Sequence, residues 1–396
     1  MFDSKVRYKG IIIAMALIIS FFGFNVKVLA SENIDNENTK AIVLMDQGTG
    51  KILYEKDKDK VLPQASVTKL MTYYIAMDYL KQNNVPLSKK VIVGGDFSSV
   101  PSDGTKVNLE KGDVITIDDL LSSLLILSAN DSAIELEKIV EDATGQDFLK
   151  LMNKKAKDLG LNNTIYINTS GLTEVKDNKK IFNTTTAYET ALLSKKIIDE
   201  YPEVLKKTSM KSFTYKNVPY HNTNKLISKN ISVDGLKTGF TNEAGYCLAS
   251  TKSISQTDKN NKPFRLVGVT LGSSEDHIRT DVNLNLLKYG QANFENKKIL
   301  GKDKVFNIKS EYHKGGSLSG AISDDLYYLM KKSSKIDIKT SIKEDLKKSV
   351  KKGDIIGTVT IKIDKVTLTE DLISTKDVKR VGVFKRIELF FKNMFK

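Results

Sequence analysis

Apolar residues follow strand-like spacing at both ends of the region from about residue 41 to 291, and helical spacing in its middle. Strands are expected at 41–46 and 51–56, joined by a Gly-containing turn, and at 212–215, 232–235, 245–250 and 264–271. Helices are expected after residue 66 and at 120–127, 133–140, 148–159, 186–198 and 281–289. A sheet made from the early and late strands, with an inserted helical block, buries these apolar faces. The fold class is therefore expected to be α+β.

The pattern changes after this region. Short alternating segments between about 297 and 376 predict a small β-rich second domain. The last 18 residues, 379–396, place apolar and basic residues on opposite faces of a helix. The apolar face holds Val381, Phe384, Ile387, Phe390, Phe391, Met394 and Phe395, and the basic face holds Lys385, Arg386, Lys392 and Lys396. We expect this helix to lie in an anionic membrane interface, the alternative being a helix docked on its own domain.

Residues 1–30 have the pattern of a secretion signal. Lys5, Arg7 and Lys9 precede an apolar stretch at 11–24, and Val28-Leu29-Ala30 fits a cleavage site. The apolar stretch is short for a membrane span, so an uncleaved anchor is the weaker alternative. The chain is therefore expected to be exported.

Composition narrows the function classes. At 396 residues and 40% hydrophobic, the chain is long enough for two domains with sizeable cores. The single cysteine, Cys247, precludes an internal disulfide and lies in an apolar stretch that predicts burial. The three histidines, His221, His277 and His313, are not clustered and are interpreted as structural, so no metal is expected. The net charge of +14 favours an anionic membrane or wall polymer as partner. Nucleic acid is not expected as a partner, because the sequence contains no nucleic-acid-binding motif.

Ser66 and Lys69 are three residues apart at the start of a predicted helix. Residues with this spacing share a helix face, so the Lys69 amine can reach the Ser66 hydroxyl. Serine needs an adjacent base to act as a nucleophile, and lysine is a base only when burial or a second cation keeps it neutral. Lys237 is the candidate for that second cation. The alternative is a serine at a helix N-terminus beside a solvated lysine.

Two further stretches complete a set of three motifs. Ser128-Ala129-Asn130 follows a buried helix and Lys237-Thr238-Gly239 follows a predicted strand, although each alone is only an ordinary helix or strand end. Ser-x-x-Lys, Ser-x-Asn and Lys-Thr-Gly in this order resemble the signature of penicillin-binding proteins and serine β-lactamases. The longer stretches 66–72, 120–132 and 234–246 resemble the low-molecular-mass serine D-Ala-D-Ala carboxypeptidases in particular. The resemblance spans roughly 41–291 and continues more weakly to the C-terminus.

The resemblance implies a domain order and an activity. It implies a signal peptide (1–30), a β-lactamase/transpeptidase-like catalytic domain (31–292), the β-rich domain (297–376) and an amphipathic membrane-anchor helix (379–396). It also implies removal of the terminal D-Ala from peptidoglycan stem pentapeptides, without a cofactor, at the outer face of the cytoplasmic membrane. β-Lactam antibiotics are then expected to acylate the same serine.

For the catalytic steps, the resemblance implies that Ser66 attacks the carbonyl between two D-alanines and forms an acyl-enzyme. Lys69 takes the serine proton, and Ser128, between Lys69 and Lys237, relays a proton to the leaving amine. The backbone N–H groups of Ser66 and Phe240 form the oxyanion hole.

For substrate binding, the resemblance implies that Asn130 holds the substrate amide through its two-sided hydrogen bonding. Lys237 and Thr238 meet the terminal carboxylate, and Gly239 allows the substrate backbone to approach closely. Arg279 matches a further carboxylate-binding arginine of the family, the alternative being a solvated arginine at a helix start.

Three other functions are open to the same residues. A serine β-lactamase needs a general base for fast deacylation, often a Glu on a loop between the second and third motifs, and the chain has no convincing loop of that kind. β-Lactamases also lack the β-rich domain and the amphipathic tail. A DD-endopeptidase would cut cross-links with the same residues. A penicillin-binding sensor or wall scaffold would keep Ser66 without turnover, which the complete catalytic set argues against.

Overall fold

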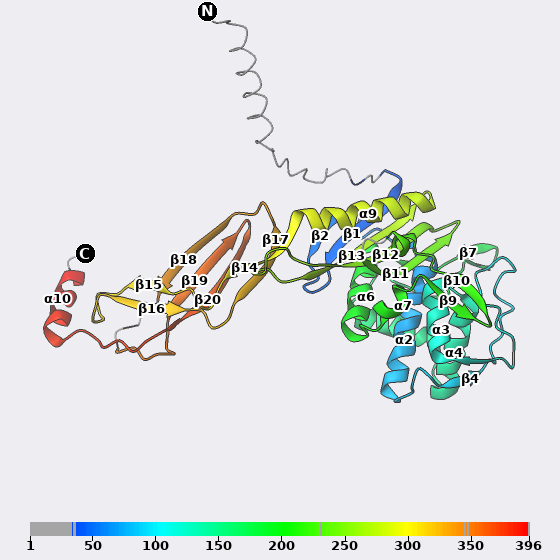
Figure 1. Ribbon diagram of the computed structural model, residues 1–396, viewed down its shortest axis with the longest axis horizontal. Helices are drawn as coiled ribbons and strands as arrows, with labels where there is room; N and C mark the ends of the chain where they lie inside the picture. The colour runs from blue at the N-terminus through cyan, green and yellow to red at the C-terminus, as the bar shows by residue number, and fades with distance from the viewer. Residues whose placement is uncertain (1–33, 35–36, 230–231, 344–345, 347, 395–396) are drawn as a thin grey trace, which may run out of the picture.

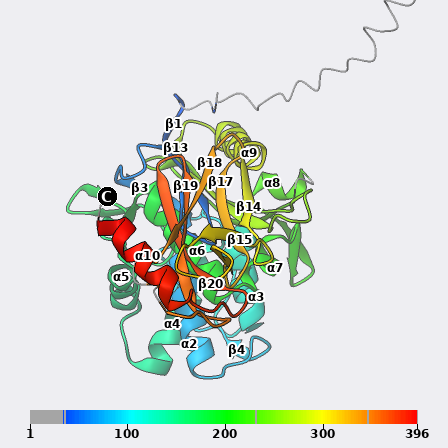
Figure 2. The same cartoon turned by 90° about the vertical axis from the view of Figure 1, so that its left-hand side faces the viewer.

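The computed structural model describes residues 34, 37–229, 232–343, 346 and 348–394, so the predicted signal segment 1–30 lies outside the described residues. Figure 1 shows a mixed α/β body and a narrower β-rich part that extends from it. The last helix, α10 (Val383–Met394), lies at the far end of the β-rich part. Seen along the long axis, α10 crosses in front of the β-rich part (Figure 2).

The body is organised around one antiparallel sheet of five strands in the order β11-β12-β13-β1-β2. These strands are β1 (Thr39–Asp46), β2 (Ile52–Lys56), β11 (Val233–Thr241), β12 (Gly245–Ile254) and β13 (Phe264–Ser273). The first strand pairs with the last, with Val43 opposite Val269. The predicted sheet of early and late strands is thus confirmed, and β11 is one of its edges.

Alternate residues of the sheet supply two different cores, because successive side chains of a strand point to opposite faces. On one face, Val43 and Val269 belong to the large core shared with the helical block. On the other face, Ile42 and Leu266 pack in a second core with residues of α9 (Asp276–Asn293), such as Leu286. The sheet is therefore covered on both sides.

The helical block is inserted between β2 and β11. Its helices are α2 (Lys69–Gln82), α3 (Ile117–Ser122), α4 (Asn130–Thr144), α5 (Phe148–Asp158), α6 (Ala187–Glu200), α7 (Val204–Thr208) and α8 (Lys225–Ser228), with a 3₁₀ turn η1 (Ala65–Thr68) and a π-helical turn η2 (Ser123–Leu127). Short strand pairs join them: β3 (Leu62–Pro63) with β8 (Thr184–Thr185), β4 (Lys90–Ile92) with β5 (Val114–Thr116), β6 (Glu174–Lys176) with β7 (Lys179–Ile181), and β9 (Ser212–Tyr215) with β10 (Val218–His221).

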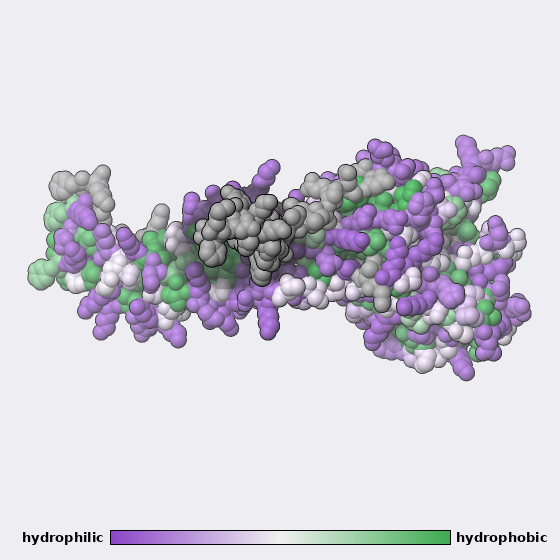
Figure 3. Space-filling view, turned by 45° about the horizontal axis from the view of Figure 1, so that its top comes forward, coloured by the Kyte–Doolittle hydropathy of each residue, from purple (hydrophilic) through white to green (hydrophobic). Residues whose placement is uncertain are grey.

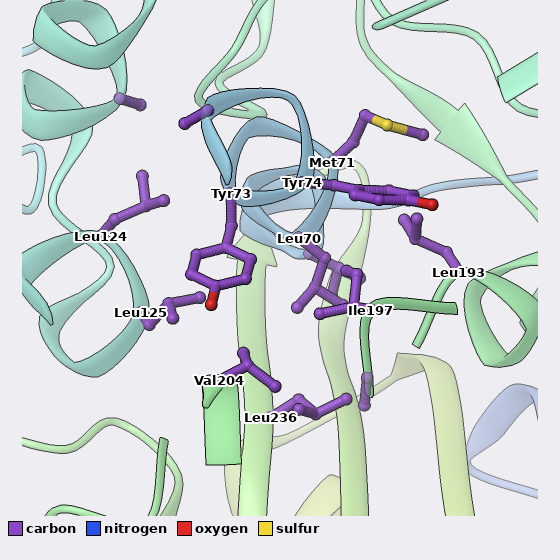
Figure 4. Packing of buried hydrophobic residues seen from close by; sticks show 14 of the residues in the cluster. Leu70, Met71, Tyr73, Tyr74, Leu124, Leu125, Leu193, Ile197, Val204 and Leu236 are labelled. Atoms are coloured by element: carbon purple, nitrogen blue, oxygen red, sulfur yellow. The ribbon is translucent and has the colours of Figure 1, made fainter. Parts of the chain in front are cut away.

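Helix α2 is central to this block. Its side chains Leu70, Met71, Tyr73 and Tyr74 are all buried and point to several sides of the helix (Figure 4). Residues 69–77 of α2 are all buried, so this part of the helix has no solvent face. Its position is therefore set by packing on every side, which makes its first residue, Lys69, a rigidly held group.

The β-rich part has its own core, and the expected β-rich segment is confirmed. Its strands are β14 (Phe294–Leu300), β15 (Phe306–Lys309), β16 (Ser317–Ala321), β17 (Leu326–Lys331), β18 (Ile336–Ile342), β19 (Ile355–Ile363) and β20 (Val366–Ser374). Five form a sheet in the order β15-β16-β20-β19-β18, and β14 pairs with β17. Leu318, Ile361 and Leu372 are fully or almost fully buried in its core. Strand β14 continues directly from α9 and joins the two parts.

Several predicted boundaries are wrong. The helix expected directly after Ser66 begins only at Lys69, and Ser66 itself lies inside the 3₁₀ turn η1. Helix α4 begins at Asn130, three residues before the predicted start. Helix α10 begins at Val383, because residues 379–381 instead pair with the backbone of residues 312–314. Phe395 and Lys396 of the predicted amphipathic faces lie outside the described residues. Over the part of the chain that is described, no helix is both long and apolar enough to cross a membrane.

Candidate active site

Ser66 and Lys69 meet across the join between η1 and α2. The Lys69 Nζ atom lies 3.0 Å from the Ser66 Oγ atom. The turn is unusual because Ala65, just before the serine, has φ +47°, a backbone region that residues with a β-carbon rarely occupy. The Lys69 side chain is completely buried. The pair therefore has the geometry of a nucleophile and a base held beside it.

Two oxygen atoms fix the Lys69 amine from the sides. Its Nζ atom donates to the Asn130 Oδ1 atom at 2.8 Å and to the backbone carbonyl of Ser170 at 2.6 Å. A neutral amine has two hydrogens and one lone pair. With both hydrogens directed to these oxygens, the lone pair is left facing the Ser66 hydroxyl, which is the arrangement that proton abstraction requires.

The charge state of Lys69 agrees with this geometry. Burial lowers its pKa to about 7, against the opposing effect of the Asp131 carboxylate. Burial also lowers the pKa of Lys237 well below its ordinary value, and the neighbouring Lys69 and Arg279 lower it further. Two buried lysines that repel each other resist being charged at the same time, so a neutral Lys69 is accessible near neutral pH.

Ser128 and Asn130 are presented by the break between two helices. Ser128 follows η2 in the left-handed conformation, with φ +77°, and is 8% exposed. The backbone N–H of Ala129 donates to the Ser123 carbonyl, and that of Asn130 donates to the Thr105 carbonyl. Asn130 then begins α4 and reaches Lys69. The Ser-x-Asn motif thus lies at a fixed corner and not at a loose helix end.

The Lys-Thr-Gly stretch runs along the edge strand β11 and lies against the Ser66 turn. A β-carbon on Gly239 would lie 3.0 Å from the backbone nitrogen atoms of Ser66 and Val67. The Lys237 Nζ atom donates to the Thr238 carbonyl at 2.7 Å, and the Thr238 Oγ1 atom lies 2.7 Å from that of Thr223. Glycine at 239 is therefore what allows the strand edge and the nucleophile turn to meet.

Arg279 lies behind this strand end, on α9. Its Nη1 atom donates to the carbonyls of Gly239 at 2.9 Å and Cys247 at 3.2 Å, and its Nη2 atom lies 2.6 Å from the Asp276 carboxylate. These contacts tie the ends of β11 and β12 to α9. The structure thus gives Arg279 partners within the protein, and its expected binding of a substrate carboxylate stays a prediction.

The turn at 168–172 is a functional element that the sequence did not reveal. No residue spacing in the sequence links this turn to Lys69, and the group it contributes is a backbone carbonyl. The turn lies directly on the nucleophile turn: Gly171 has φ +82°, and a β-carbon there would come within 2.0 Å of the Ala65 carbonyl oxygen. The buried Asn183 amide holds it by donating to Thr68 Oγ1 and to the Asn168 carbonyl, each at 2.9 Å.

Outside these motifs, the side chains that could carry chemistry are metal ligands and the single cysteine, Cys247. In the described ranges, no three His, Cys, Asp or Glu side chains come close enough together to hold a metal ion. Cys247 is fully buried, as predicted, and burial raises the pKa of its thiol to about 11, which makes it a poor nucleophile.

The fold, and the buried lysine held beside a serine, are those of a serine hydrolase. The chain belongs to the peptidase S11 family, described as D-alanyl-D-alanine carboxypeptidase, whose family model matches residues 28–274. Residues 294–380 match the model of the penicillin-binding protein 5 C-terminal domain.

Individual relatives agree with this assignment. D-alanyl-D-alanine carboxypeptidase DacF of Bacillus subtilis is 31% identical over 87% of this chain and 86% of its own length. A D-alanyl-D-alanine endopeptidase of Escherichia coli is 34% identical, but over only 57% of this chain and 69% of its own. Among solved structures, penicillin binding protein 5 of Haemophilus influenzae matches with a TM-score of 0.64 and 28% identity, covering 86% of this chain and 98% of that one.

Proposed function

We propose that this protein is a D-Ala-D-Ala carboxypeptidase that removes the terminal D-Ala from peptidoglycan stem pentapeptides and is acylated by β-lactams. The observation that carries the proposal is the buried Lys69 amine, held 3.0 Å from the Ser66 hydroxyl by two fixed oxygen acceptors. Membership of the family and the match to both parts of the chain support it.

In the proposed acylation step, the Ser66 Oγ atom attacks the carbonyl carbon between the two D-alanines while Lys69 takes the hydroxyl proton. The carbonyl oxygen becomes an oxyanion, which the N–H groups of Ser66 and Phe240 stabilise by about 3 kcal/mol per donor. The C–N bond then breaks, and Ser128 passes a proton to the leaving amine of D-Ala. Water hydrolyses the ester in the second half of the reaction, with Lys69 again as the base.

In the proposed substrate complex, the terminal carboxylate lies near Lys237 and Thr238 and the peptide runs along the edge of β11. Asn130 binds the amide of the peptide with the part of its side chain that Lys69 does not occupy. Arg279 adds positive potential behind the carboxylate while it holds the ends of β11 and β12. The close contact between Gly239 and Ser66 supports this placement, because it leaves the strand edge beside the nucleophile.

We also propose that α10 attaches the exported enzyme to the outer face of the cytoplasmic membrane. The side chains of Phe384, Phe390 and Phe391 are 91%, 64% and 51% exposed, and Lys385 and Arg386 lie on the same short helix. Apolar residues gather with basic ones at this end of the molecule (Figure 3). Such a helix buries its apolar face at a lipid interface and binds anionic headgroups with its cations.

A DD-endopeptidase is the second candidate, favoured by the 34% identity to the Escherichia coli endopeptidase. It would cleave a D-alanyl bond in a cross-link with the same acyl-enzyme. Coverage favours the carboxypeptidase, because the endopeptidase matches only 57% of this chain whereas the carboxypeptidase DacF matches 87%.

The test is release of D-alanine from diacetyl-Lys-D-Ala-D-Ala, with fluorescent penicillin labelling measured in parallel. Turnover that penicillin blocks, and loss of both signals in Ser66→Ala, are the expected results. Labelling without D-alanine release would favour the endopeptidase or a sensor, and purified cross-linked dimers would separate these two. Rapid loss of the label would indicate a β-lactamase. Retained D-alanine release in Ser66→Ala would refute the proposal.

A further inference from the structure

The Ser170 carbonyl orients the Lys69 amine, so whatever holds the Ser170 carbonyl also controls the base. Thr169, its neighbour, is fixed at two points. Its backbone carbonyl accepts a hydrogen bond from the Thr72 Oγ1 atom at 2.6 Å, and its own hydroxyl donates to the Glu137 Oε2 atom at 2.8 Å. One anchor therefore comes from α2, the helix that begins with Lys69, and the other from α4.

Thr169 and Ser170 are buried, but the space on the outer side of this turn is only partly filled. A cavity of about 520 Å³ lies there, and Thr169, Ser170 and Glu137 are among the residues that line it. A turn with open space on one side can move toward that space unless hydrogen bonds prevent it. The bond between Thr169 and Glu137 is the one that spans from the turn to α4 on this side.

The surroundings of Glu137 disfavour the charged form of its carboxyl group. Burial raises its pKa, the Thr169 hydrogen bond lowers it, and the acidic groups of Glu141, Asp147 and Glu174 raise it further. No ion pair within the described ranges offsets this cost for Glu137. A half-buried acid without a cation destabilises a fold. What Glu137 contributes at this position is an acceptor for the Thr169 hydroxyl, and this hydrogen bond restrains Thr169.

Helix α4 links the two acceptors of the base. Asn130 is its first residue and Glu137 lies seven residues further on, about 10 Å along the helix axis. We infer that Glu137 is a positioning residue for acylation: through Thr169 it holds the Ser170 carbonyl, so that one rigid helix fixes both oxygens that aim the Lys69 lone pair at Ser66. This inference rests on the proposed function.

The experiment compares two disruptive variants with their conservative counterparts in the full chain. Thr169→Val and Glu137→Leu remove the hydrogen bond with little change of volume, whereas Thr169→Ser and Glu137→Gln keep a donor and an acceptor. Asp142→Asn is the control, because Asp142 lines the same cavity but pairs with Lys138 and does not contact the turn. The measurements are the second-order rate of penicillin acylation, kcat and KM for D-alanine release, and the melting temperature.

The disruptive variants are expected to lower the acylation rate and kcat at least tenfold with KM changed less than threefold, since a misplaced base weakens chemistry more than binding. The conservative variants and the control should stay within threefold of the wild type. Wild-type acylation rates in both disruptive variants would overturn the inference. So would a loss of activity that follows the melting temperature and KM, or one that the conservative variants share. If the wild type itself neither binds penicillin nor releases D-alanine, the proposed function fails instead.

Discussion

Lowering the pH should slow the acylation of Ser66, because the reaction needs Lys69 in its neutral form. Burial has lowered the pKa of Lys69 from 10.5 to about 7, which corresponds to about 5 kcal/mol of disfavoured charge. Below pH 7 the neutral fraction falls about tenfold per pH unit, so roughly a tenth remains at pH 6 and a hundredth at pH 5. The acylation rate should follow this fraction.

The assay is the second-order rate constant for acylation by fluorescent penicillin between pH 5 and 9, which reports the ionisation of the free enzyme. Below pH 7 the logarithm of this rate constant is expected to rise by one for each pH unit. Circular dichroism at each pH controls for unfolding. A rate that is constant from pH 8 to 5.5, or an acid limb near pH 10, would refute the assignment of Lys69 as a buried neutral base.

Three further changes test the framework around the site. Gly171→Ala should lower the free energy of unfolding by about 3 kcal/mol or more and slow acylation, because its β-carbon would lie 2.0 Å from a backbone oxygen. Gly160→Ala is the control, because Gly160 also has a positive φ but open space around it, and this change should lower the free energy of unfolding by only about 1 kcal/mol in urea melts. Asn183→Leu leaves the Thr68 Oγ1 atom and the Asn168 carbonyl without their donor, so we expect the free energy of unfolding to fall by roughly 2–3 kcal/mol. A loss under about 0.5 kcal/mol would contradict the role given to Asn183. Phe384→Asp should weaken binding to anionic lipid vesicles at least tenfold without changing release of D-alanine from a soluble peptide. Val175→Asp is the control, because Val175 is also largely exposed but lies on the body, and it should leave vesicle binding unchanged.

The parts of the fold that depend on side-chain patterns could be predicted from the sequence. The continuous apolar runs of β1 and β13 identify two buried strands, and their predicted placement in one sheet is observed. The spacing of Ser66 and Lys69 identifies a contact that the structure contains. These features are encoded in the identity and order of residues, which is what a sequence displays.

The remaining parts depend on backbone atoms and on tertiary contacts. The Ser170 carbonyl has no side-chain signature, and 101 residues separate it from Lys69. The helix begins at Lys69 and not directly after Ser66, and Ala65 has a positive φ in a turn that lies against Gly171 and Gly239. Residues 379–381 were predicted to be helical but pair with a distant loop, a competing use of their backbone that local periodicity does not reveal.

The assembly of the site from distant segments makes penicillin binding a conformational probe. The Lys69 amine is fixed by residues 61 and 101 positions away in the chain, and contacts of such separation form late because long loops must close first. A chain that has formed only its hairpins and isolated helices carries an inert serine. A covalent β-lactam label therefore counts molecules that have finished folding, and the time course of labelling during refolding would follow the last step of that process.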